Sequence, residues 1–160
     1  MAILFYGRYE HKIDSKGRIQ IPVAIRKAGI NTVYSEFMLL RGPDNCLALV
    51  PEDDFIKNFD SFRPETLKKG ESAKIMRRLY PNAFKLPLDN QGRILLPKNL
   101  RDIAGIENDA LIIGVGAWIE IWNKDRYEMV CDDSKVGYDE IADLFFSTLG
   151  RKKPDENNDV

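Results

Sequence analysis

Two five-residue segments of this 160-residue chain carry an aspartate, a glycine and an arginine at the same spacing. They are Asp14-Ser15-Lys16-Gly17-Arg18 and Asp89-Asn90-Gln91-Gly92-Arg93. An aspartate that opens a turn accepts hydrogen bonds from backbone N–H groups two residues on, and a glycine that closes it can adopt a positive φ. We therefore expect four residues to shape two tight turns: Asp14, Gly17, Asp89 and Gly92.

The arginine after each glycine can do two kinds of chemistry. It can pair with the aspartate of its own turn, and such surface ion pairs contribute less than about 1 kcal/mol. It can also hold guanine O6 and N7, or a phosphate, through two N–H groups at once. The residue types alone favour the ion pair.

Two aspartates at matched positions also suggest a hydrolase in which neighbouring carboxylates share a proton. However, a cation four residues after each aspartate lowers the carboxyl pKa and opposes proton sharing. One histidine and two cysteines, His11, Cys46 and Cys131, are too few for a structural zinc site, which needs about four ligands. We therefore expect no enzyme activity, no metal and no cofactor.

Both turns lie within a longer internal repeat. Residues 9–26 align with residues 84–101 at a constant offset of 75, which places Pro22 on Pro97 and Arg26 on Arg101. Farther along, residues 46–50 correspond to residues 118–122, and Phe55 corresponds to Tyr127. The chain is therefore a tandem duplication.

Each copy predicts the same series of short elements. Alternating apolar residues predict a β-hairpin around each turn, and the proline that follows suits the first turn of a short helix. We expect these helices over 23–28 and from Pro97 to Gly105, and further strands over 37–42, 46–50, 110–115 and 117–122. Apolar stripes predict amphipathic helices starting at Pro51, around Leu67–Leu79 and over Tyr138–Leu149.

A unit of about 45 residues buries too little surface to stand alone. Two copies solve this problem if their strands interleave into one barrel with pseudo-twofold symmetry. The predicted fold class is therefore mainly β with short helices, that is, α+β, with flanking amphipathic helices. The two turns should then lie near each other.

Charge is uneven along the chain, although its net value is −1. Residues 63–101 carry +7 and residues 102–150 carry −8. A local concentration of cations can bind nucleic acid, while solvated helices are the simpler explanation. The longest uncharged run, residues 110–119, is too short to span a membrane, so we expect a soluble, cytoplasmic protein.

The segment Phe5–Arg18, followed by Ile21-Pro22 and Arg26, resembles the opening of MraZ proteins, which belong to the AbrB-like, swapped-hairpin group. The resemblance continues to Leu100-Arg101 and covers about residues 3–149. It implies AbrB-like units over 8–54 and 83–126, a helical connector over 55–82 and a helical segment over 127–150. For residues 151–160 we expect a disordered tail.

The resemblance also implies a function. MraZ proteins are transcriptional regulators that assemble into rings and bind short direct repeats upstream of the division and cell-wall gene cluster, at the nucleoid. It implies that Arg18 and Arg93 contact double-stranded DNA. Lys16 could then bind phosphate, and Gln91 could read adenine or bind backbone. Secondary candidates flank the first hairpin: Arg8, His11 and Lys12.

One alternative stays open beside the regulator. AbrB-like barrels are reused, so the chain could be an antitoxin-like module that captures a protein with its helices. The two-carboxylate hydrolase is the weaker alternative.

Overall fold

A computed structural model describes residues 4–27, 36–59, 70–132 and 137–149. The chain divides into two compact units, residues 1–127 and 128–160. The first unit contains both copies of the repeat. The expected tail over 151–160, the end of the helix expected over 23–28, and Leu67 lie outside the described residues.

The strands follow the predicted order in both copies. The first copy contributes β1 (Arg8–Lys12), β2 (Arg18–Gln20), β3 (Glu36–Arg41) and β4 (Leu47–Pro51). The second contributes β5 (Phe84–Pro87), β6 (Arg93–Leu95), β7 (Asp109–Gly114) and β8 (Ile119–Trp122). The expected strands are therefore confirmed, with boundaries shifted by one or two residues.

The helices also match between the copies. Matched pairs are α1 (Val23–Arg26) with α4 (Lys98–Ala104), and α2 (Glu52–Phe59) with α5 (Lys124–Asp132). The connector contains α3 (Glu71–Leu79), and the second unit contains α6 (Tyr138–Leu149). Short 3-10 turns occupy Pro43–Asn45 and Tyr80–Asn82.

The sheets show how the copies interleave. Six strands pair in the order β1-β7-β8-β4-β3-β5, and β2 pairs with β6 in a separate two-stranded ribbon; every pairing is antiparallel. The six-strand order is unchanged when equivalent strands of the two copies are exchanged. The predicted interleaving with pseudo-twofold symmetry is therefore confirmed.

The symmetry axis can be placed from the strand register. In the ribbon Ile19 lies opposite Ile94, its own equivalent in the other copy. In the six-stranded sheet Ala48 lies opposite Glu120, again its own equivalent. The axis thus passes through both pairs, from the centre of the sheet to the centre of the ribbon.

The main core lies between the six-stranded sheet and the ribbon. Ile19 and Ile94 point into it with 0% and 1% of their surface exposed, and Leu49, Ile121 and Leu100 are fully buried around them. Burying an isoleucine or leucine completely contributes about 1.5–3 kcal/mol. The described ladders form an open sheet facing a ribbon, so side chains and helices, rather than a continuous hydrogen-bonded barrel, complete the enclosure of the core.

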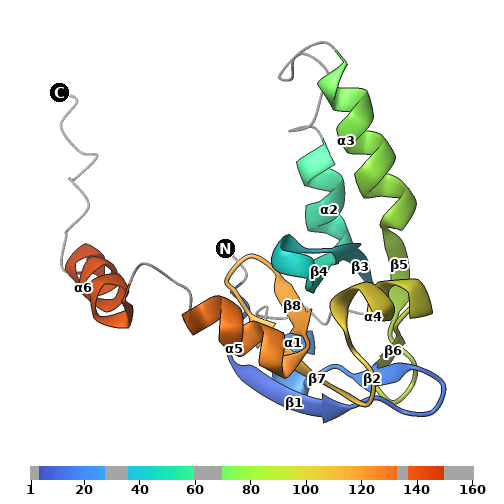
Figure 1. The fold of residues 1–160 in the computed structure, drawn as a ribbon, viewed down its shortest axis with the longest axis horizontal. Coiled ribbons are helices and arrows are strands. Elements are labelled where there is room, and N and C mark those ends of the chain that lie inside the picture. The colour runs from blue at the N-terminus through green and yellow to red at the C-terminus, as the bar shows by residue number, and fades with distance from the viewer. Residues whose placement is uncertain (1–3, 28–35, 60–69, 133–136, 150–160) are drawn as a thin grey trace, which may run out of the picture. The chain divides into compact units, whose positions relative to one another are not determined.

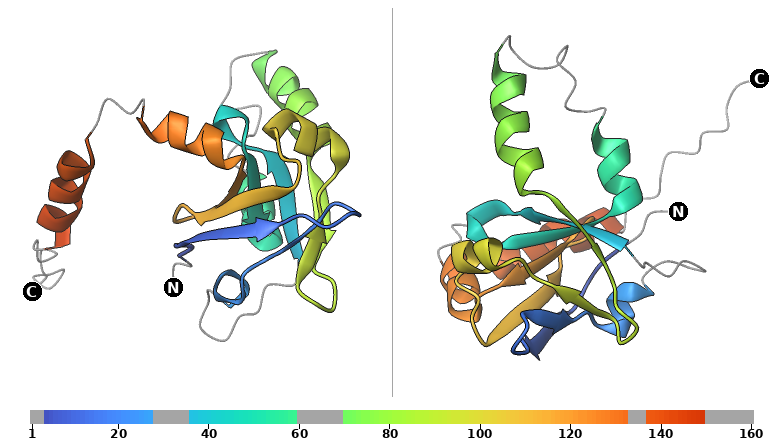
Figure 2. Two further views of the ribbon diagram at one scale, coloured as in Figure 1. Left: turned by 60° about the horizontal axis from the view of Figure 1, so that its bottom comes forward. Right: turned by 90° about the vertical axis from the view of Figure 1, so that its right-hand side faces the viewer.

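The ribbon and the helices α2 and α3 lie at opposite ends of the first unit. Helices α2 and α3 project from the side of the sheet remote from β2 and β6 (Figures 1 and 2). The two turns therefore lie on a surface that these helices leave uncovered.

The helix of the second unit is amphipathic, as its sequence predicts. Its large apolar side chains are 50% to 81% exposed: Tyr138, Ile141, Leu144, Phe145, Phe146 and Leu149. Among the described residues, no helix has both the length and the apolar character needed to cross a membrane.

Candidate nucleic-acid interface

The aspartate at the start of each turn accepts hydrogen bonds from backbone N–H groups later in the same turn. Asp14 Oδ1 accepts the backbone N–H groups of Lys16 and Arg18, both at 2.9 Å. The carbonyl of Asp14 accepts the N–H of Gly17 at 3.0 Å, and Gly17 has a φ of +84°. The side chain thus satisfies two N–H groups that the tight turn leaves without a strand partner.

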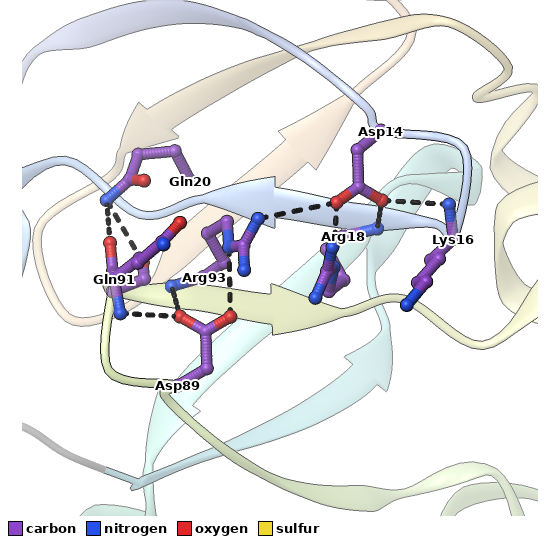
Figure 3. Close-up of polar contacts among 8 residues, drawn as sticks. Asp14, Lys16, Arg18, Gln20, Asp89, Gln91 and Arg93 are labelled. Carbon is purple, nitrogen blue, oxygen red and sulfur yellow. Dashed lines mark hydrogen bonds and ion pairs between the residues drawn. The ribbon is translucent and has the colours of Figure 1, made fainter.

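The second turn repeats this geometry. Asp89 Oδ1 accepts the N–H groups of Gln91 and Arg93, both at 2.9 Å, and Gly92 has a φ of +74°. The aspartates thus make matching hydrogen bonds in both copies (Figure 3).

Both arginines form the ion pair that their residue types predict. Arg18 Nε donates to Asp14 Oδ2 at 2.7 Å, and Arg93 Nε donates to Asp89 Oδ2 at 2.9 Å. Arg93 Nη1 also lies 3.6 Å from Asp14 Oδ2, so one carboxylate contacts the arginines of both copies. This contact confirms that the two turns lie together.

The ion pair leaves part of each guanidinium accessible. The Arg18 and Arg93 side chains are 32% and 24% exposed. Within the described residues, the side-chain contacts of Arg18 involve Nε alone, and its two Nη groups bind no other side chain. The aspartate therefore fixes the guanidinium from one side while N–H donors remain on the other.

The electrostatics keep both carboxylates ionised. The pKa of Asp14 falls to about 2, chiefly because it accepts the Arg18 backbone N–H, with further lowering by the Arg18 side chain and the Lys16 N–H; partial burial opposes this. The pKa of Asp89 is lowered mainly by the Arg93 backbone N–H. Two ionised carboxylates do not share a proton, which argues against the hydrolase alternative.

Each turn is also held by the opposite copy. The N–H of Leu96 donates to the Gly17 carbonyl, and the N–H of Ile21 donates to the Gly92 carbonyl, both at 2.9 Å. Gln20 Nε2 donates to the carbonyl of Gln91 at 2.8 Å. Neither turn is therefore a free loop.

Two further arginines lie directly behind the turn glycines. A Cβ on Gly17 would lie 3.0 Å from the guanidinium of Arg101, and a Cβ on Gly92 would lie 2.6 Å from that of Arg26. Arg101 Nε is held by the Leu96 carbonyl at 3.1 Å. The sequence analysis aligned Arg26 with Arg101 but assigned no role to them or to Gln20. The matched position of the two arginines in the repeat was the feature that could have indicated their role.

Most of the other predicted residues lie at the turns. Lys16 and Gln91 are exposed at the two tips, and Lys12 is exposed at the end of β1 nearest the first turn. His11 is half-buried and lies opposite Ala110.

Arg8 lies apart from the other predicted residues. It is at the far end of β1, about 13 Å from Lys12 at the usual rise of about 3.3 Å per residue. There its guanidinium lies 5.5 Å from the centre of the Tyr127 ring and 4.0 Å from the Glu10 carboxylate. Arg8 is therefore not brought to the turns.

The described residues show no group of three or more histidine, cysteine, aspartate or glutamate side chains that could hold a metal ion. Both cysteines are free; Cys46 is buried and Cys131 is exposed.

Comparison with known proteins assigns the family. The model of the family described as "MraZ protein, putative antitoxin-like" matches residues 4–78 and again residues 79–143. The chain belongs to the MraZ family. The two matches to this family divide the chain between its two copies, in agreement with the duplication.

Individual MraZ proteins match over most of the chain. A protein named transcriptional regulator MraZ from Alkaliphilus metalliredigens is 38% identical over 139 residues, which cover 87% of this chain and 94% of the relative. Its namesake from Syntrophomonas wolfei is 36% identical over 140 residues, covering 88% and 95%. The resemblance seen in the sequence is therefore confirmed across both copies.

Proposed function

We propose that this chain is a sequence-specific DNA-binding transcriptional regulator and not an enzyme. The observation that carries the proposal is the pair of arginines on one exposed face of the β2–β6 ribbon, each anchored through Nε by its own turn. A two-stranded ribbon fits the major groove, which is about 12 Å wide and displays a distinct pattern for each base pair. The names of the relatives support regulation of transcription.

Preorganisation explains how these side chains read DNA. A free arginine loses rotamer freedom when it binds, whereas Arg18 and Arg93 are already held by carboxylates. Their remaining N–H donors are suited to guanine O6 and N7. Lys16 and Gln91, at the exposed tips, supply contacts to phosphate or to a neighbouring base.

Multivalency strengthens a small contact surface. One ribbon covers few base pairs, so a single subunit binds weakly, and several subunits on consecutive repeats bind tightly through high local concentration. The exposed apolar side chains of α6 offer a surface for contact between copies in a ring. The proposed targets are short direct repeats in the promoter of the division and cell-wall gene cluster, which places the protein in the cytoplasm at the nucleoid.

A protein-binding function is the second candidate. It is favoured by an apolar groove of about 410 Å³ beside α2 and α3, lined by Val50, Phe55, Tyr80 and Trp118 among others. Salt separates the two functions, because DNA affinity falls steeply with added salt as phosphate contacts are lost. Binding of a cellular protein that is insensitive to salt would favour this second function.

Arginine substitutions test the regulator directly. The protected site is first footprinted on the DNA upstream of its own gene, and affinities are then measured by fluorescence anisotropy. We expect Arg18→Ala and Arg93→Ala each to weaken specific binding by about 5- to 150-fold, the equivalent of about 1–3 kcal/mol per bidentate base contact. Arg78→Ala, on α3 and remote from the ribbon, is the matched control and should leave affinity unchanged. Normal affinity in both ribbon variants, with normal circular dichroism, would reject this face as the DNA site.

The number of repeats tests multivalency. Deleting one repeat should reduce affinity far more than changing the sequence between repeats, because it removes a whole tethered contact. Equal losses in the two DNAs would contradict binding by several subunits.

A further inference from the structure

The outer face of the ribbon carries an exposed leucine. Leu95 is 54% exposed although it is in a regular strand between two buried residues, Ile94 and Leu96, each 1% exposed. The alternation of a strand accounts for this, since burying the neighbours turns Leu95 outward. In the register of the ribbon it lies opposite Arg18.

The two halves of this face differ at one matched position. Gln20 is the equivalent of Leu95 in the first copy and lies opposite Arg93. Its side-chain amide donates to the carbonyls of Gln91 and Gly92, at 2.8 Å and 3.3 Å, so it supports the second turn. One arginine therefore has an apolar neighbour and the other has a polar neighbour.

We propose that Leu95 contacts the methyl group of a thymine in the base pair next to the one read by Arg18. This inference rests on the proposed function of the ribbon. The thymine C5-methyl is the apolar group that base edges present in the major groove. Cross-strand neighbours have Cβ atoms about 4.5–5.5 Å apart, which is between one and two base-pair steps of about 3.4 Å, so the two side chains can reach adjacent base pairs.

The inference gives each subunit a direction on DNA. A DNA-binding ribbon with identical halves would prefer a sequence with twofold symmetry. Arg18 with Leu95 on one side, and Arg93 with Gln20 on the other, select different flanking bases. Such a ribbon favours binding sites in the same orientation, which is the arrangement of direct repeats.

Uracil scanning tests the thymine contact. Within the footprinted site, each thymine is replaced in turn by uracil, which removes the methyl group and keeps base pairing. The guanine read by Arg18 is the one whose substitution reduces the DNA affinity of Arg18→Ala least. We expect one uracil replacement beside this guanine to weaken wild-type binding by about fourfold, the effect of one buried methyl group. In Leu95→Ala and Leu95→Gln that same replacement should have no effect.

The controls separate this inference from the proposed function. Ile56→Ala removes a similarly exposed apolar side chain, on α2, and should keep the wild-type response to uracil. Specific binding with no response to uracil at any thymine, or a response that persists in the Leu95 variants, would overturn the role of Leu95 alone. Absence of any specific DNA binding by the wild-type protein would overturn the proposed function itself.

Discussion

Replacing Gly92 by alanine tests whether the second turn depends on the arginine behind it. Gly92 has a φ of +74°, and an added Cβ would lie 2.6 Å from Cζ and Nη1 of Arg26. Gly116 has a φ of +91°, but its added Cβ would meet its nearest neighbour, Leu4 Cδ1, at 3.9 Å, an ordinary contact. The two substitutions thus share the backbone penalty and differ in steric overlap.

The size of the effect follows from these two contributions. A left-handed backbone costs a residue with a Cβ about 1–2 kcal/mol, so Gly116→Ala should lose about that much free energy of unfolding. Overpacking costs about 1–3 kcal/mol, but the overlapping atoms lie at the end of the flexible Arg26 side chain, so the lower value applies and the expected loss in Gly92→Ala is about 2–3 kcal/mol. At about 2–4 °C per kcal/mol for a chain of this length, the difference is measurable by thermal unfolding.

The assay is urea and thermal unfolding followed by circular dichroism, in the wild-type and Arg26→Ala backgrounds. Removing the guanidinium makes room for the Cβ, so in Arg26→Ala the alanine at position 92 should cost no more than Gly116→Ala. An equal loss for the two glycine variants in the wild-type background, or an unchanged loss at position 92 without Arg26, would refute the packing argument.

Three further outcomes are expected. Ile94→Ala and Ile19→Ala should each lose about 2–5 kcal/mol in urea unfolding, because both fill the core on the symmetry axis; a loss below about 1 kcal/mol would contradict that placement. The folded-state pKa of Asp14, about 2, lies below its usual 3.8, so its contribution to stability is complete above pH 4 and declines from pH 4 toward pH 2. Thermal melts of Asp14→Asn should show less acid sensitivity over that range than the wild type, and equal slopes would count against the turn geometry. A thiol reagent should label Cys131 in the native protein and leave Cys46 unlabelled until unfolding, since burial protects Cys46 and raises its pKa; equal labelling rates would exclude this.

Features set by neighbouring residues were predictable from the sequence. The aspartate and glycine of each turn act within five residues, so their spacing alone predicts their hydrogen bonds. The alternation that predicts the hairpin strands also accounts for buried Ile19 and Ile94 between outward-facing residues. The duplication predicts the interleaving, because one copy is too small to bury a core.

Contacts between the copies were not predictable in the same way. The bond from Gln20 to Gln91 joins residues 71 positions apart, and the approach of Arg26 to Gly92 depends on the same interleaving. Sequence reasoning also treated the ion pair and DNA contact as alternatives for Arg18. The geometry makes them compatible, because Arg18 Nε forms the ion pair and the Nη groups are left for a DNA contact.

The crossed bonds from Leu96 to Gly17 and from Ile21 to Gly92 have a consequence for the gene. A polypeptide with one repeat alone would lack the strand that pairs with its own turn. It would have to pair with a second molecule to obtain that strand. Fusing both repeats in one reading frame makes this pairing independent of protein concentration. It also allows the two halves to differ, as Gln20 and Leu95 do.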